Sequence, residues 1–152
     1  MVMATSLLFG ACNSKDIDIE VKVKAKENME NVIGRSDIKV KDGRMTPEVL
    51  WAMGRIGGMN VSPDGQKVVY TVAYYSVPEN RSNREVFVMN ADGTDNKQIT
   101  KTAYSENEAV WIKGGKKIAF LCNESGSSQL WEMNPDGSDR KQLSRYDLSL
   151  IH

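Results

Sequence analysis

Short stretches of this chain alternate between apolar and polar residues, the pattern of β-strands that bury one face. The clearest lie in two similar modules, at 67–72 and 85–90 in the first and at 117–122 and 129–134 in the second. They are rich in Val, Ile, Phe, Tyr and Trp, which fit a pleated, half-buried surface. Asp-Gly and Gly-Gly pairs separate them, and glycine accepts the positive φ of tight hairpin turns. We therefore expect each module to be an up-and-down antiparallel sheet of four short strands.

The two modules repeat one another in sequence. Residues 85–100 return as 129–144 with a shift of 44, and the closing strands are expected at 97–100 and 141–144. Seven positions are unchanged: Met89, Asn90, Asp92, Gly93, Asp95, Lys97 and Gln98 recur as Met133, Asn134, Asp136, Gly137, Asp139, Lys141 and Gln142. A repeat of about 40 to 45 residues, built from short strands and Asp-Gly turns, predicts β-propeller blades.

The modules differ in length at one place. Residues 59–72 match 109–122 with a shift of 50, so a difference of six residues falls between positions 72 and 85. Length variation belongs in loops, where backbone groups are solvated. We therefore expect a longer loop at 73–84 in the first module than at 123–128 in the second.

The expected fold class is all-β: a partial β-propeller of about two four-stranded antiparallel blades, preceded by a strand or hairpin segment and a short helix. Blade one takes residues 59–104, blade two takes 105–146, and 147–152 are expected to be the truncated start of a further element. Because a blade cannot bury both faces alone, two blades imply more. Open sheet edges and an uncovered face favour aggregation, so we expect residues 1–152 alone to be poorly soluble or dimeric.

The first 44 residues fall into two parts of different composition. Residues 1–12 are apolar and uncharged up to Cys12 and look like the end of a bacterial lipoprotein signal, which predicts lipid attachment at Cys12. The alternative is a free cysteine in an unstructured start. Residues 13–44 are expected to form a tether and strand segment, because 16–26 alternate charged and apolar residues and 37–43 repeat this pattern more briefly.

Residues 45–58 have the pattern of a short helix followed by a link. Thr46 is a candidate N-cap, Pro47 suits the first helical position, and Gly54 can end the helix. Its apolar stripe is expected to pack on blade one and consists of Val49, Leu50 and Met53.

Composition narrows the function classes. The 152 residues include 20 Lys and Arg and 20 Asp and Glu, so the formal net charge is zero and the sequence pI is near 6.6. This balance gives no electrostatic reason to expect a nucleic-acid partner. No apolar run is long enough to span a membrane, so we expect membrane contact only through a lipid anchor on Cys12.

The sequence offers no candidate catalytic, cofactor-binding or metal-binding residue, and no cofactor is expected. The single histidine is the terminal His152, and no G-x-S-x-G nucleophile elbow is present. Cys122 lies in an apolar strand, where a thiol is usually inert. On these residues alone, the chain is not expected to be a catalyst.

Two repeated pairs have alternative interpretations. Two aspartate pairs could be mistaken for calcium ligands: Asp92 with Asp95, and Asp136 with Asp139. A calcium loop usually supplies more carboxylates and a late Glu, so a role in the turns is favoured. Trp111 and Trp131 are expected to pack between blades rather than to form a ligand platform.

Several of these stretches resemble known propellers. Residues 62–70 and 130–144 look like the repeats of TolB and of the prolyl-oligopeptidase family. The opening at 45–51 followed by the Ser-Pro-Asp-Gly blade, together with 83–93, is similar to bacterial dipeptidyl peptidases and acylaminoacyl peptidases of that family. The resemblance covers about residues 45 to 144. It implies a longer protein in which further blades and a C-terminal α/β-hydrolase domain accompany this propeller start.

The resemblance leads to two function hypotheses. In the first, the chain is the N-terminal propeller part of a cell-envelope serine exopeptidase that releases dipeptides, with the propeller gating access of short peptide substrates to the hydrolase domain. The resemblance would then place the triad in that domain. The second is a non-enzymatic, TolB-like propeller that mediates protein–protein interaction in the bacterial envelope. A minor third possibility is a 152-residue protein that oligomerises to close a ring.

Overall fold

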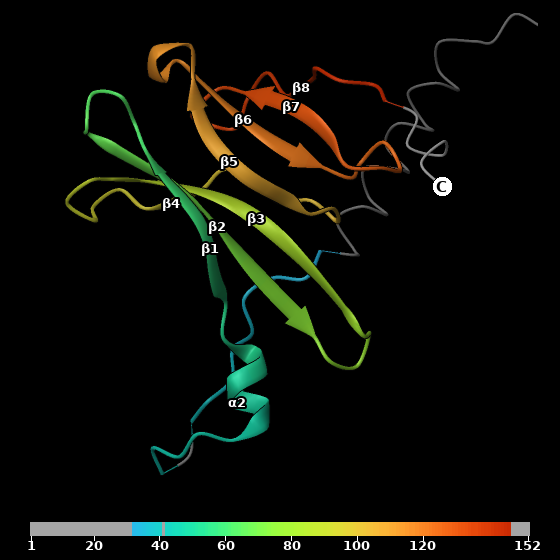
Figure 1. Cartoon of the computed structure of the whole chain (residues 1–152). Helices are drawn as coiled ribbons and strands as arrows, with labels where there is room; N and C mark the ends of the chain where they lie inside the picture. The colour runs from blue at the N-terminus through green and yellow to red at the C-terminus, as the bar shows by residue number, and fades with distance from the viewer. Residues whose placement is uncertain (1–31, 41, 147–152) are drawn as a thin grey trace, which may run out of the picture.

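The computed structural model describes residues 32–40 and 42–146. One short helix, α2, precedes eight strands, which form two four-stranded antiparallel sheets in the orders β1-β2-β3-β4 and β5-β6-β7-β8 (Figure 1). The elements are α2 (Pro47–Ala52), β1 (Arg55–Val61), β2 (Lys67–Ser76), β3 (Arg81–Asn90), β4 (Lys97–Gln98), β5 (Glu106–Ile112), the short 3-10 helix η1 (Lys113–Gly115), β6 (Lys117–Cys122), β7 (Gln129–Met133) and β8 (Lys141–Gln142). The expectation of an all-β partial propeller with a short helix is confirmed.

Asp-Gly turns connect the third and fourth strands of each sheet in the same way. The carboxylate of Asp92 accepts hydrogen bonds from the backbone N–H and the hydroxyl of Thr94, at 2.9 and 2.7 Å. Asp136 accepts the corresponding bonds from Ser138, at 2.9 and 2.6 Å. Gly93 and Gly137 adopt positive φ values of 85° and 86°. The predicted turn role of these aspartates is confirmed, and the local bonds explain why the sequence repeats them.

The main core lies between the two sheets. Its buried members come from both blades: Val69, Val86, Val88, Ala109, Trp111, Ile118, Phe120, Cys122 and Met133, with Trp131 packed against them. Trp111 also bonds to the first blade, because its backbone N–H and its indole N–H donate to the side chain and backbone oxygens of Asn60, at 3.0 and 3.1 Å. The predicted packing role of the two tryptophans is therefore confirmed.

The opposite face of blade two has exposed apolar side chains in the described structure. Strand alternation places Val110 and Leu130 on the side away from Phe120 and Trp131. Val110, Leu130 and the neighbouring Leu143 remain 40%, 39% and 44% exposed. Exposed apolar side chains of this kind are what another blade would cover.

Two sequence expectations are wrong. The loop predicted at 73–84 is mostly strand, because β2 and β3 stay paired as far as Ser76 and Arg81, so the six extra residues lengthen a hairpin. The strand expected at 37–43 does not form in residues 37–40 and 42–43, where Ile38 and Val40 are 42% and 50% exposed. An alternating pattern gives a strand only where a sheet edge is available to pair with it.

The remaining N-terminal and C-terminal expectations fall outside the described residues. These are the signal segment 1–12 with Cys12, the strand at 16–26, and the C-terminal stretch 147–152 with His152. The helix is present, with the hydroxyl of Thr46 accepting from the backbone N–H of Val49 at 3.4 Å. No helix in the described part of the chain is both long and apolar enough to cross a membrane.

Candidate functional site

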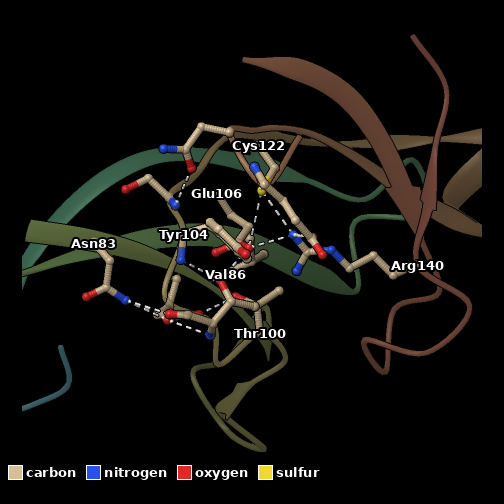
Figure 2. Close-up of polar contacts among 12 residues, drawn as sticks. Asn83, Val86, Thr100, Tyr104, Glu106, Cys122 and Arg140 are labelled. Atoms are coloured by element: carbon tan, nitrogen blue, oxygen red, sulfur yellow. Dashed lines mark hydrogen bonds and ion pairs between the residues drawn. The ribbon is translucent and has the colours of Figure 1, made fainter. Parts of the chain in front are cut away.

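A cluster of buried and partly buried polar side chains lies where blade one passes into blade two. We call it the junction cluster, and its members are Asn83 and Glu85 on β3, Thr100 and Thr102 after β4, Glu106 on β5, Cys122 on β6 and Arg140 before β8. Figure 2 labels Asn83, Thr100, Glu106, Cys122 and Arg140 of this cluster, which come from strands and connecting segments of both blades. Buried polar groups are costly unless their hydrogen bonds are made, so the cluster stands out from the apolar core around it.

Glu85 ties the third strand of blade one to the segment that leaves it. Its carboxylate is fully buried and accepts hydrogen bonds from the Thr100 hydroxyl at 2.7 Å, the Asn83 amide at 2.8 Å and the Thr102 backbone N–H at 3.1 Å. The Thr100 hydroxyl in turn accepts from the backbone N–H of Val86 at 2.8 Å. Burial raises the pKa of Glu85 to about 7, although the hydrogen bond from Thr100 opposes the shift.

Arg140 reaches across blade two to a second buried carboxylate. Its guanidinium lies 2.8 Å from Glu106 and 3.0 Å from Glu124, and it covers the rings of Phe120 and Trp131 at 5.2 and 5.1 Å from their centroids (Figure 2 shows the arginine and Glu106). Burial raises the pKa of Glu106, and the nearby Arg140 charge opposes that rise. Arg140 thus links the segment just before β8 to β5, the first strand of blade two.

The contacts of Glu85 recur in blade two with a neutral residue. Gln129 stands 44 positions after Glu85, and its carbonyl oxygen accepts from the Ser144 hydroxyl at 2.8 Å and the Tyr146 backbone N–H at 3.0 Å. The Ser144 hydroxyl accepts from the backbone N–H of Leu130 at 2.8 Å. In blade one, Glu85 accepts the corresponding bonds from Thr100 and Thr102, and the Thr100 hydroxyl accepts the corresponding bond from the backbone N–H of Val86. Each blade therefore uses the same motif to fix the direction of the chain that leaves its fourth strand.

The junction cluster has no arrangement suited to nucleophilic catalysis. Burial raises the pKa of the Cys122 thiol to about 11, so the thiolate that would attack a substrate is scarce at neutral pH. The described ranges contain no histidine that would act as its base. Within residues 32–40 and 42–146, no three His, Cys, Asp or Glu side chains lie close enough to hold a metal ion. The chemistry of the cluster is that of a structural connector.

Sequence patterns predicted the turns and the packing tryptophans but not Glu85, Glu106 and Arg140. One signal was present, since Glu85 directly precedes the apolar residues 86–89 and its counterpart in the repeat is the isosteric Gln129. No local pattern indicates Glu106 or Arg140, because their partners are distant in sequence. The predicted lipid-attachment residue, Cys12, lies outside the described ranges.

No protein-family model matches the chain. Over 86 residues, which are 57% of its length, the chain is 46% identical to dipeptidyl-peptidase 5 of Porphyromonas gingivalis, and the match covers 13% of that protein. It is also 41% identical over 86 residues to dipeptidyl-peptidase 5 of Porphyromonas endodontalis, covering 12% of it. These similarities support an N-terminal propeller portion of a prolyl-oligopeptidase-family peptidase.

The fold comparison agrees with a propeller segment. The acylaminoacyl peptidase of Pyrococcus horikoshii superposes with a TM-score of 0.52 at 16% identity, over 64% of this chain and 15% of that one. At this identity the similarity concerns the fold alone. The chain spans about an eighth of the length of the curated dipeptidyl-peptidase 5 relatives that it matches.

Proposed function

We propose that this chain is the N-terminal propeller part of a serine exopeptidase that releases dipeptides from short peptides. The observation that carries the proposal is the 46% identity to dipeptidyl-peptidase 5 over 86 residues. The two consecutive blades and the exposed apolar side chains on the face of blade two away from the core support it, because both suit a sheet stack that continues. The reaction itself is assigned to a hydrolase domain that these two blades do not provide.

In this proposal the propeller limits access to the catalytic domain. Antiparallel blades joined by tight turns make a stiff wall, and the buried motifs at Glu85 and Gln129 fix the segment that leaves each blade to that blade's third strand. A stiff wall would exclude large folded proteins while short peptides pass. We further propose that the protein lies in the bacterial cell envelope, held at the membrane by a lipid on Cys12.

The proposal is tested by comparing two proteins. The full-length gene product and residues 1–152 alone are assayed with a chromogenic dipeptidyl substrate, and both are treated with a fluorophosphonate that labels active serine hydrolases. We expect hydrolysis and labelling only for the full-length product. A full-length product that neither hydrolyses the substrate nor reacts with the probe would overturn the peptidase assignment and favour a propeller that only binds partners.

The lipid anchor has its own test. Growth of the native bacterium with an alkyne-modified palmitate, followed by isolation of the protein, should yield a labelled product. A Cys12→Ser variant should lose the label and leave the membrane fraction. Retention of the label by the variant would contradict the assignment of Cys12.

A further inference from the structure

An open groove lies at the end of blade one that is distant from the Asp-Gly turns. The segment 32–38, the helix α2 and the lengthened β2–β3 hairpin line it, and its volume is about 880 Å³. That volume is near the upper end of the roughly 300–1,000 Å³ found for ligand pockets. The hairpin part of the lining comes from the stretch whose six extra residues distinguish blade one from blade two.

The wall of the groove contains a fixed aromatic pair. The rings of Trp51 on α2 and Tyr75 on β2 meet edge to face, with centroids 5.6 Å apart at 64°. The guanidinium of Arg55 lies 4.7 Å from the Trp51 centroid and 4.5 Å from that of Tyr75. Stacking on a cation restrains both rings while Trp51 stays 41% exposed. The groove therefore offers a pre-formed apolar surface, which lowers the entropy cost of binding.

Three charged side chains, the carboxylates of Asp37, Glu48 and Glu79, line the groove directly, and the Arg55 guanidinium is stacked on its aromatic pair. Glu79 is paired with Arg81, but Asp37 and Glu48 are exposed and have no Lys or Arg at ion-pair distance in the described part of the chain. Hydrogen bonding at the start of α2 lowers the pKa of Glu48, so its charge is present at neutral pH. An acidic groove with an aromatic wall is complementary to a ligand that combines a cation with an apolar group.

We propose that this groove binds an extended polypeptide segment that carries a lysine or arginine beside an apolar side chain. The apolar side chain packs against Trp51, and the cation lies between Asp37 and Glu48. A groove of this volume accommodates several side chains and is larger than a simple amine requires. The proposal does not depend on the peptidase assignment, because no residue of a hydrolase domain takes part.

Calorimetric titration of the full-length gene product, treated with a fluorophosphonate to prevent hydrolysis, tests the proposal. The probe is a pentapeptide with blocked ends and one lysine between two leucines, compared with the same peptide carrying glutamate instead. The test variant is the double change Asp37→Asn and Glu48→Gln, which preserves shape and removes both charges. The matched control is Glu108→Gln, which neutralises an exposed carboxylate on blade two.

We expect the lysine peptide to bind and the glutamate peptide to bind at least tenfold more weakly. Exposed ion pairs are individually weak, so the double variant should bind the lysine peptide roughly three- to tenfold more weakly, while Glu108→Gln leaves binding unchanged. Raising the salt concentration should weaken binding to the unaltered protein. Equal affinity for the two peptides, or for the double variant and its control, would overturn the proposal. Hexylamine binding as tightly as the peptide would also overturn it, because the site would then serve a small cation.

Discussion

Raising the pH from 5 to 8 is predicted to loosen the junction between the blades, because Glu85 must then ionise in a buried position. The pKa of Glu85 is about 7 in the folded chain, against an ordinary value of 4.5. A carboxyl group whose folded-state pKa is raised binds its proton more tightly in the folded state. Its contribution to stability is therefore complete below pH 4.5 and is lost as the pH rises through 7.

The magnitude follows from the size of the shift. A rise of the Glu85 pKa from 4.5 to about 7 corresponds to roughly 3 kcal/mol, most of which falls between pH 5 and pH 8. The raised pKa of Glu106 acts in the same direction. The exposed aspartates of the turns have lowered pKa values and lose their contributions only at acid pH, so they do not oppose the trend in this range.

Hydrogen exchange measured by mass spectrometry on the full-length gene product reports this loss locally. Protection factors for the amides of residues 84–102, corrected for intrinsic exchange, should fall between pH 5 and pH 8. In Glu85→Gln the fall should be much smaller, because only Glu106 remains to titrate. Glu79→Gln, which neutralises an exposed carboxylate in the same blade, should behave as the unaltered protein does. A pH-independent protection in the unaltered protein, or the same fall in Glu85→Gln, would refute this reasoning.

Two further changes test the contacts between and within the blades. Arg140→Met leaves the buried Glu106 carboxylate without its cation and should lower the free energy of unfolding by about 3 kcal/mol in urea denaturation, whereas a loss below about 1 kcal/mol would contradict the role of the pair. Gly137→Ala places a Cβ against the backbone carbonyl oxygen of Ile99, while Gly93→Ala, at nearly the same φ in blade one, meets nothing. The first variant should therefore melt several degrees below the second, and equal melting temperatures would contradict the close approach of blade two's turn to blade one.

Strands were most predictable where the internal repeat and the two-residue alternation of apolar and polar side chains indicated the same segment. Val69 and Phe120 lie in runs that alternate and recur, so their strands were predictable. The turns at Asp92 and Asp136 were predictable because their hydrogen bonds reach only two residues along the chain. Such local chemistry is visible in a single sequence.

The errors have a physical cause in common. Pro78 and several turn formers made 73–84 look like a loop, yet Pro78 lies in the turn itself and the β-forming Tyr74 and Tyr75 pair with Asn83 and Ser82. The alternation at 37–43 describes a strand that has no partner within the described ranges. In both cases pairing decided the outcome, and pairing is not encoded in the segment alone.

The junction cluster could not be predicted from the sequence for a related reason. Glu106 and Arg140 are far apart in the chain, and their meeting depends on how β5, β6 and β7 pair. The groove at Trp51 likewise lies between α2 and the β2–β3 hairpin, which are separated in the chain by the strand β1. Only the folded arrangement brings such residues together, which is why a sequence pattern identified the blades but not the sites on them.

The central claim is that these two blades begin a much longer peptidase, and the intact mass of the native protein tests it most directly. The matched stretch covers only 13% of the P. gingivalis dipeptidyl-peptidase 5, so that relative is several times longer than this chain. We predict a native species several times heavier than the 17.0 kDa of this chain, which gains the mass of one fluorophosphonate adduct and yields peptides from residues 47–146 on digestion. A native species of 17.0 kDa, or a long species that gains no adduct, would contradict the claim.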